Sequence, residues 1–420
     1  MADERSTHQR ILVVGGGMSG LSAALEAAEA GYEAVVVEKN PYLGGRVAQL
    51  HQYFPKLCPP ACGLEINFRR AKANRLVRFF TNARVAKIEG EAGDFKATIE
   101  LGPRYINENC TACGKCAEVV ATEVDNPFEL GLSKTKAVYL PHALAYPCRY
   151  VMDPAILGTD EALKVKEVCA YDAVDLEAKP ETMELDVGAV VWATGWDPFD
   201  AAKVEYYGFG RYPNVISNLQ MERLSSAEGP TGGKILRPSD GKAPKTVAFI
   251  QCAGSRDLNY LPYCSGVCCL ASIKQAGYVL EQEPEAKVYI LFIDIRAQDR
   301  LDEFYQNAQE IDNLTFVKSK IANIVADEET GSLTLEGEDT AKGEQIRLNA
   351  DLVVLATGMV PNTTGLPEGV ATDEYGFIPA DSGRPGLVGA GCARKPYNVA
   401  ECVQDATGAA LKAIQAIARR

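Results

Sequence analysis

The stretch Ile11-Leu-Val-Val-Gly-Gly-Gly-Met-Ser-Gly20 decides the fold of this chain. Its apolar first part predicts a buried strand over residues 11–14, and the alanine-rich segment 21–31 predicts a helix closed by glycine. Residues 33–37 predict a second strand, and Glu38 follows it directly. The G-x-G-x-x-G spacing falls on Gly15, Gly17 and Gly20. A strand, a glycine turn, a helix and a second strand ending in an acid indicate a dinucleotide-binding βαβ unit.

Each glycine of this motif has its own expected role. Gly15 permits the tight turn, Gly17 lets backbone approach a pyrophosphate, and Gly20 lets the helix pack on the strand. The helix N-terminus would offer amide donors and the positive end of its dipole to the phosphates. Glu38 would accept hydrogen bonds from an adenosine ribose.

Four later segments resemble the turns that hold FAD in flavoproteins with two dinucleotide domains. They are Gly44-Gly45-Arg46, Val190–Gly195, Val353–Gly358 and Gly386–Gly391. In that family an aspartate usually follows the last glycine, whereas this chain has Cys392. Asn398 is a candidate cap for a C-terminal helix whose N-terminus would face the flavin. The residues expected to bind FAD are Gly15, Gly17, Met18, Ser19, Gly20, Glu38, Lys39, Gly44, Gly45, Arg46, Ala193, Thr194, Gly195, Gly391, Cys392, Asn398 and Val399.

A second nucleotide domain is expected between about Pro244 and Asn362. Residues 246–250 predict its first strand. The strand is followed by Gln251-Cys-Ala-Gly-Ser-Arg256, which retains only one glycine of the binding motif. We therefore expect the shape of the domain without NAD(P)H binding.

A cysteine-rich segment interrupts the first domain. Cys110, Cys113 and Cys116 follow the C-x2-C-x2-C pattern, and Cys169-Ala-Tyr-Asp-Ala-Val174 resembles the end of a second ferredoxin run. In two-cluster ferredoxins the last cysteine of one run binds the cluster of the other. These four cysteines therefore predict one [4Fe-4S] cluster. Zinc is the alternative metal, and Cys148 is the rival fourth ligand.

A further group of cysteines consists of Cys252, Cys264, Cys268 and Cys269. The spacing of Cys264 and Cys268 fits one turn of a helix, which would point both toward one place. Three interpretations stay open: a second cluster completed by Cys58, Cys62 or a partner subunit, buried unreactive thiols, or a redox-active pair.

Composition excludes several classes of protein. Apolar residues make up 47% of the 420 residues, as in an ordinary globular protein. The net charge of −13 argues against nucleic acid and anionic membranes as direct partners. No apolar run reaches the roughly 18 residues that span a bilayer, and the polar start of the chain is not a secretory signal. Clustered cysteines, thirteen in all, suggest metal or redox chemistry in a reducing cytoplasm.

Two segments, together with the flavin motifs and their insert, resemble the A subunits of the heterodisulfide reductase family. The two segments are Phe249–Arg256 and Tyr263–Cys269. The resemblance extends over nearly the whole chain. The fold class is therefore α/β: a two-dinucleotide-domain, thioredoxin-reductase-like flavoprotein with an inserted ferredoxin-like α+β domain. The expected divisions are 1–102 (FAD domain, first part), 103–184 (iron–sulfur insert), 185–243 (FAD domain return and linker), 244–362 (second nucleotide-like domain) and 363–420 (FAD domain, C-terminal part).

The segment Tyr53–Asn67, and the expected lack of the long members' extra domains, resemble the short members of the family. These are the flavoprotein subunits of quinone-interacting membrane-bound oxidoreductase (Qmo) complexes. The resemblance implies electron transfer between menaquinone and adenylylsulfate reductase in dissimilatory sulfur metabolism. It also implies two partner proteins, a membrane cytochrome b/iron–sulfur subunit plus a sister flavin–iron–sulfur subunit, which would hold this cytoplasmic chain at the inner membrane. The alternatives are a subunit of a flavin-bifurcating heterodisulfide reductase and a NAD(P)H-dependent thiol reductase. We identify no catalytic side chain.

Overall fold

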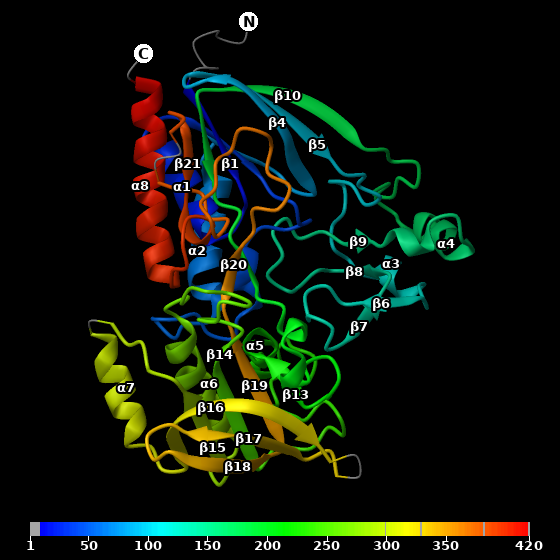
Figure 1. The fold of residues 1–420 in the computed structure, drawn as a ribbon. Helices are drawn as coiled ribbons and strands as arrows, with labels where there is room; N and C mark the ends of the chain where they lie inside the picture. Colours follow the sequence, from blue (N-terminus) through cyan, green and yellow to red (C-terminus); the bar gives the residue numbers. More distant parts are fainter. Residues whose placement is uncertain (1–8, 299, 328–329, 381–382, 419–420) are drawn as a thin grey trace, which may run out of the picture.

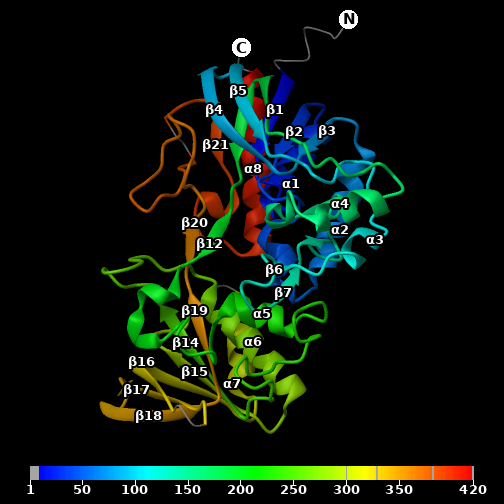
Figure 2. The same cartoon turned by 90° about the vertical axis from the view of Figure 1, so that its right-hand side faces the viewer.

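The structure is a computed structural model that describes residues 9–298, 300–327, 330–380 and 383–418. Most of the polar N-terminal segment lies outside the described residues. Figure 1 shows two stacked domains with a smaller insert at their side, and Figure 2 shows the same arrangement after a quarter turn. None of the helices in the described ranges is long and apolar enough to cross a membrane.

The first domain is built on a parallel sheet in the order β21-β11-β1-β2-β3. Its strands are β1 (Arg10–Val14), β2 (Glu33–Val37), β3 (Val77–Phe80), β11 (Ala189–Trp192) and β21 (Leu387–Gly389). Helices α1 (Met18–Glu29), α2 (Pro60–Ala73) and α8 (Val399–Ala418) belong to the same domain. An antiparallel layer consists of β4 (Ala83–Glu91), β5 (Asp94–Leu101) and β10 (Glu181–Val187).

Both faces of the parallel sheet are buried, which explains its unbroken apolar strands. Successive side chains of a strand point to opposite faces. Ile11 and Val13 pack with α1 and α8, whereas Leu12 and Val14 pack with the antiparallel layer around Phe95. The predicted strand and helix are both present. The helix begins at Met18, three residues earlier than predicted, so its first turn includes Gly20.

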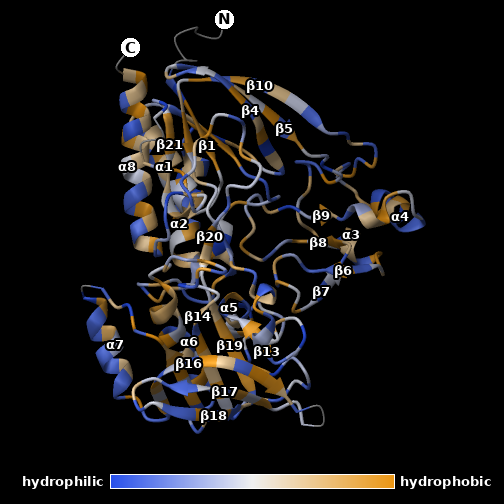
Figure 3. Ribbon diagram, in the orientation of Figure 1, coloured by the Kyte–Doolittle hydropathy of each residue, from blue (hydrophilic) through white to orange (hydrophobic). Residues whose placement is uncertain are grey.

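The second domain contains a seven-stranded sheet in the order β13-β19-β14-β15-β16-β17-β18. Its strands are β13 (Val215–Ser217), β14 (Thr246–Ala253), β15 (Lys287–Phe292), β16 (Leu314–Ala326), β17 (Leu333–Asp339), β18 (Glu344–Ala350) and β19 (Leu352–Thr357). Its helices are α5 (Asn218–Ser225), α6 (Cys268–Gln282) and α7 (Leu301–Gln309). Figure 3 shows hydrophobic residues along β14 and β19 and hydrophilic residues over α7. The sheet includes β13, so the domain reaches back beyond the predicted start at 244.

Short elements complete the chain. The antiparallel pair β12 (Trp196–Pro198) and β20 (Met359–Pro361) joins the two domains. The insert contains α3 (Lys115–Glu118), β6 (Glu123–Asp125), β7 (Lys134–Lys136), β8 (Val138–Tyr139), β9 (Val151–Met152) and α4 (Asp160–Val168). Single 3-10 turns are η2 (Gly45–Gln49), η3 (Pro154–Ile156), η4 (Ala201–Lys203), η5 (Glu205–Tyr207) and η6 (Gly391–Ala393).

Candidate functional site

A cavity of about 400 Å³ opens at the carboxyl ends of β1, β2 and β11. Ligands of parallel α/β sheets bind at this edge. The cavity brings together most of the residues predicted to bind FAD. They are Gly15, Gly17, Met18, Ser19, Glu38, Lys39, Gly45, Arg46, Ala193, Thr194, Gly195 and Cys392.

The glycine turn is packed so closely that side chains are excluded. Gly15 has φ +109°, and a Cβ added there would lie 2.2 Å from the carbonyl oxygen of Ala193. A Cβ on Gly20 would lie 1.8 Å from the carbonyl oxygen of Gly15. Gly17 instead faces the second glycine loop, where a Cβ on Gly45 would lie 2.8 Å from Gly17 Cα. This is the tight helix–strand approach expected of a phosphate-binding turn.

Glu38 is held rigidly at the end of β2. Its carboxylate accepts hydrogen bonds from the backbone N–H of Gly16 (2.6 Å) and of Asn40 (2.8 Å). The side chain is almost fully buried, and this burial raises its pKa above the ordinary glutamate value. Each carboxylate oxygen has a further lone pair, so the group can still accept a ribose hydroxyl.

An unpartnered hydroxyl shows that the cavity suits a polar ligand. Thr194 Oγ1 is buried in the cavity wall and makes no hydrogen bond within the described residues. A buried polar group without a partner costs free energy that a ligand can recover. The bare glycine cradle and this hydroxyl both fit a dinucleotide.

Arg46 closes one side of the cavity. Its guanidinium donates to the carbonyl oxygen of Trp196 (3.2 Å) and pairs with Asp197. The insert closes another side, since Pro127 and Leu130 also line the cavity. Sequence reasoning did not predict these two lining residues. They carry no motif, and only the tertiary fold brings them to the cavity.

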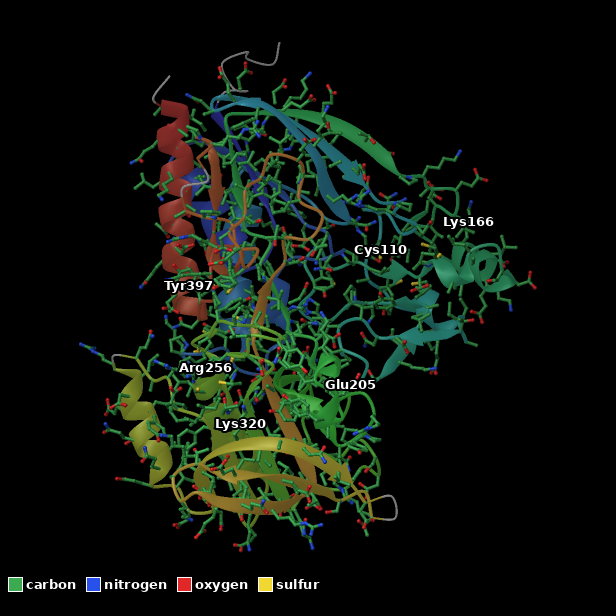
Figure 4. All side chains as sticks on the ribbon, viewed as in Figure 1. Cys110, Lys166, Glu205, Arg256, Lys320 and Tyr397 are labelled. Atoms are coloured by element: carbon green, nitrogen blue, oxygen red, sulfur yellow. The ribbon has the colours of Figure 1, made fainter. Side chains whose placement is uncertain are left out.

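A second cavity, of about 110 Å³, adjoins the first and lies between the two domains. Both are lined by Met18, Arg46, Val47, Trp196, Cys392 and Cys402. Asn398 and Val399 line this second cavity, at the start of α8, opposite Cys268 and Lys274 of α6. Figure 4 labels Tyr397 at the lower end of α8 and Arg256 on the facing edge of the second domain. The chamber thus continues the glycine-turn cavity into the space between the domains.

Three predicted FAD residues, Gly20 among them, line neither cavity. Gly44 packs against Leu64 and Phe68, and Gly391 packs against Ser19. Asn398 is the predicted cap: its side-chain oxygen accepts from the N–H of Glu401 (3.0 Å). The Glu401 carboxylate accepts in return from the N–H of Asn398 (2.8 Å).

The insert gathers its four predicted ligands around one small cavity. Cys110, Cys113, Cys116 and Cys169 all line it, together with Tyr150. Cys148, the rival ligand, is not among the lining residues. Figure 4 labels Cys110 in this part of the insert. Four thiols from two distant segments therefore face one space.

Burial disfavours the ionised form of one cysteine in this cavity. Burial raises the pKa of the Cys116 thiol to about 11, and the neighbouring Cys110 adds to the rise. Iron or zinc would supply the positive charge that thiolates need there. Sulfurs bound to one zinc ion lie about 2.3 Å from it. Among the described side chains no three His, Cys, Asp or Glu converge closely enough to hold a single metal ion.

The remaining cysteine group lies around the start of α6. Cys252, Cys268 and Cys269 interact electrostatically with one another and with Cys264. One prediction was wrong: Cys264 does not share a helical turn with Cys268, because α6 begins only at Cys268. Gly266, between the two, has φ +70° and precludes a helix there.

The turn after β14 in the second domain lacks the glycines of a dinucleotide-binding turn, except for Gly254. A Cβ on Gly254 would lie 2.2 Å from a ring carbon of Phe199. The aromatic side chain occupies the space above the turn after β14. The absence of NAD(P)H binding stays a prediction, and this packing agrees with it.

Comparisons with known proteins agree with this geometry. Residues 13–81 match the family model of an NAD(P)-binding Rossmann-like domain. Nearly the whole chain is similar to the A subunits of heterodisulfide reductases. It is 39% identical to the second iron-sulfur A subunit of the CoB–CoM heterodisulfide reductase of Methanopyrus kandleri, over 97% of this chain and 64% of that protein. It is 38% identical to the A subunit of the H(2):CoB-CoM heterodisulfide,ferredoxin reductase of Methanothermobacter marburgensis, over 98% of this chain and 64% of that protein.

These relatives are longer, and the chain spans less than two thirds of their length. Among solved structures, thioredoxin reductase of T. acidophilum superposes with a TM-score of 0.51 at 17% identity. The match covers 97% of this chain and 98% of that one. The fold is therefore that of a thioredoxin-reductase-like protein with two Rossmann domains, as predicted.

Proposed function

We propose that this chain is an electron-transferring oxidoreductase subunit with FAD and one [4Fe-4S] cluster. FAD would lie on the glycine turn, with its ring in the chamber between the domains. The cluster would be bound by Cys110, Cys113, Cys116 and Cys169. A flavin exchanges two electrons and a cluster one, so the pair connects two-electron and one-electron partners.

One observation carries this proposal: the insert that holds the four cysteines also forms part of the flavin cavity. Pro127 and Leu130 line the cavity. Beside it, Gln49 donates to the carbonyl oxygen of Phe128 (3.1 Å), and the N–H of Leu43 donates to that of Tyr146 (2.8 Å). Contact of this kind holds two redox centres at a fixed separation.

The first test counts cofactors in protein purified without oxygen. We expect one FAD and about four irons per chain, and an EPR signal after reduction. About eight irons would place a second cluster at the group of Cys252, Cys264, Cys268 and Cys269. Zinc in place of iron, or no flavin, would overturn the proposal.

A variant pair identifies the fourth ligand. Cys169→Ser should lose the cluster, because its side chain lines the cavity. Cys148→Ser is the matched control and should keep full iron content. Iron loss in the control with retention in Cys169→Ser would reverse the assignment.

We further propose that the complex is of the Qmo type, with adenylylsulfate reductase as electron partner and menaquinone reached through a membrane subunit. The short-form segment Tyr53–Asn67 supports this choice. The second candidate is a heterodisulfide reductase complex, which the 39% identity to one of its subunits favours.

The two candidates differ in the protein that reoxidises the flavin. The reduced chain is mixed without oxygen with adenylylsulfate reductase, or with subunits that reduce CoB–CoM heterodisulfide. The return of flavin absorbance is then followed. Faster return with adenylylsulfate reductase supports the Qmo assignment, and faster return with the other subunits supports a heterodisulfide reductase.

A further inference from the structure

Two cysteines outside every predicted cluster touch each other in the wall of the flavin site. Cys392 and Cys402 have their sulfurs 3.5 Å apart. Cys392 lies in η6 after β21, and Cys402 lies in the first turn of α8. Both line the glycine-turn cavity and the chamber between the domains. The thiols therefore stand where the two cavities meet.

The two thiols have different surroundings. Cys392 donates to the carbonyl oxygen of Tyr397 (3.5 Å). Either sulfur could donate in the contact between the two thiols. This contact and the Ser19 hydroxyl lower the pKa of the Cys402 thiol, while the same contact raises the pKa of Cys392. Cys402 also lies at a helix N-terminus, where the dipole favours a thiolate.

We propose that Cys392 and Cys402 are a redox-active dithiol that exchanges two electrons with the flavin. The inference rests on the function proposed above, because the flavin is the electron partner. On oxidation both S–H bonds break and one S–S bond forms. Two electrons and one proton pass to the oxidised flavin, and the second proton leaves to water. In the reverse direction the disulfide takes back two electrons and two protons.

This pair would give the chain a second two-electron store beside the one-electron cluster. Both side chains are buried, with exposed fractions of 5% and 8%. Bulk thiols therefore have little access, and the flavin is the natural partner. The group at the start of α6 belongs to the other domain, and its Cys268 lines the chamber from the opposite side.

The first experiment uses the unaltered holoprotein. It is oxidised through its flavin without oxygen, using ferricyanide, then denatured with an alkylating reagent and mapped by peptide mass spectrometry. We expect a linked pair of peptides containing Cys392 and Cys402, two hydrogens lighter than the free peptides. The link should disappear after dithionite. Alkylation of both cysteines in the oxidised sample would overturn the inference.

The second experiment counts electrons. The oxidised wild type should take up two more electrons per chain from dithionite than Cys402→Ser, at equal flavin and iron content. Val403→Ser, which alters the exposed neighbour of Cys402 on α8, should match the wild type. Equal uptake by all three proteins would overturn the inference while the bound flavin still upholds the proposed function. Purified protein without flavin would instead overturn the proposed function.

Discussion

The tightest steric constraint in the site falls on single glycines. Gly20 has no room for a methyl group, because a Cβ would lie 1.8 Å from the carbonyl oxygen of Gly15. We expect Gly20→Ala to lower the free energy of unfolding by about 1–3 kcal/mol, the usual cost of overpacking. FAD content should fall with it, since the turn must shift. Urea unfolding and flavin absorbance measure both.

Gly408→Ala is the matched control for this substitution. It also lies in a helix, and nothing stands within 4 Å of its added Cβ. Alanine is the better helix former, so this variant should gain about 0.5–1 kcal/mol. A loss of stability in the control, or none in Gly20→Ala, would contradict the steric argument.

A single half-buried histidine makes the stability of the fold depend on pH. His142 stacks on Phe128, with ring centres 4.5 Å apart, and burial lowers its pKa to about 4. The unfolded state, with an ordinary pKa near 6.5, then binds more protons than the folded state. The contribution of the neutral ring is present above about pH 6.5 and is lost as the pH falls toward 4.

We therefore expect stability to fall by at most about 1.4 kcal/mol per pH unit in this window through His142 alone. His142→Phe keeps an aromatic ring and should flatten the curve. The measurement is the urea midpoint of apoprotein between pH 7 and 4. Parallel curves for both proteins would show that His142 contributes no proton linkage.

At the scale of the elements, the stability of α8 depends on the hydrogen bonds at its N-terminus. Asn398 and Glu401 exchange hydrogen bonds with each other's backbone, which is a capping box. Asn398→Ala should cost about 1 kcal/mol of unfolding free energy. Asn398→Ser keeps a capping oxygen and should stay close to the wild type. Thermal unfolding of apoprotein compares the two, and equal losses would show that the cap is not the cause.

The elements also show how far sequence reasoning reached. The first strand and the cap at Asn398 were predictable because local periodicity and capping chemistry determine them. The position of Cys169 beside the other three cysteines was predictable, because in ferredoxins the last cysteine of one run lies with the first three of the other. Pro127 and Leu130 were not, since only tertiary packing brings them to the flavin cavity. The start of α6 was missed because Cys264–Cys268 spacing does not reveal a left-handed glycine between the two cysteines.

At the scale of the whole molecule, a buried ion pair joins the insert to the second domain. Arg223 of α5 makes a two-point contact with Glu129, at 2.9 and 3.0 Å, and also donates to the carbonyl oxygen of Gln49. Both charged side chains are almost inaccessible, with exposed fractions of 2% and 6%. Glu129 lies between Phe128 and Leu130, in the segment that borders the flavin cavity. We therefore expect this pair to hold the segment of the insert that borders the cavity against α5.

Arg223→Leu should leave the Glu129 carboxylate buried without a partner, which typically costs about 3–5 kcal/mol. The double variant with Glu129→Leu should recover much of that loss, because both charges are then removed. Arg84→Leu, which breaks an exposed pair with Glu100, is the control and should cost less than about 1 kcal/mol. Urea unfolding of the wild type, Arg223→Leu, Glu129→Leu and the double variant completes the cycle, with Arg84→Leu measured beside them.

The same variants test whether insert position matters for electron transfer. Arg223→Leu should slow cluster reduction by the reduced flavin, as followed by rapid-freeze EPR, while flavin and iron content stay unchanged. The slowing follows because the released segment no longer holds the two centres at one separation. Wild-type rates in Arg223→Leu, at full cofactor content, would mean that the ion pair stabilises the fold without setting the electron path. Loss of iron together with the slower rate would instead place its effect on the cluster cavity itself.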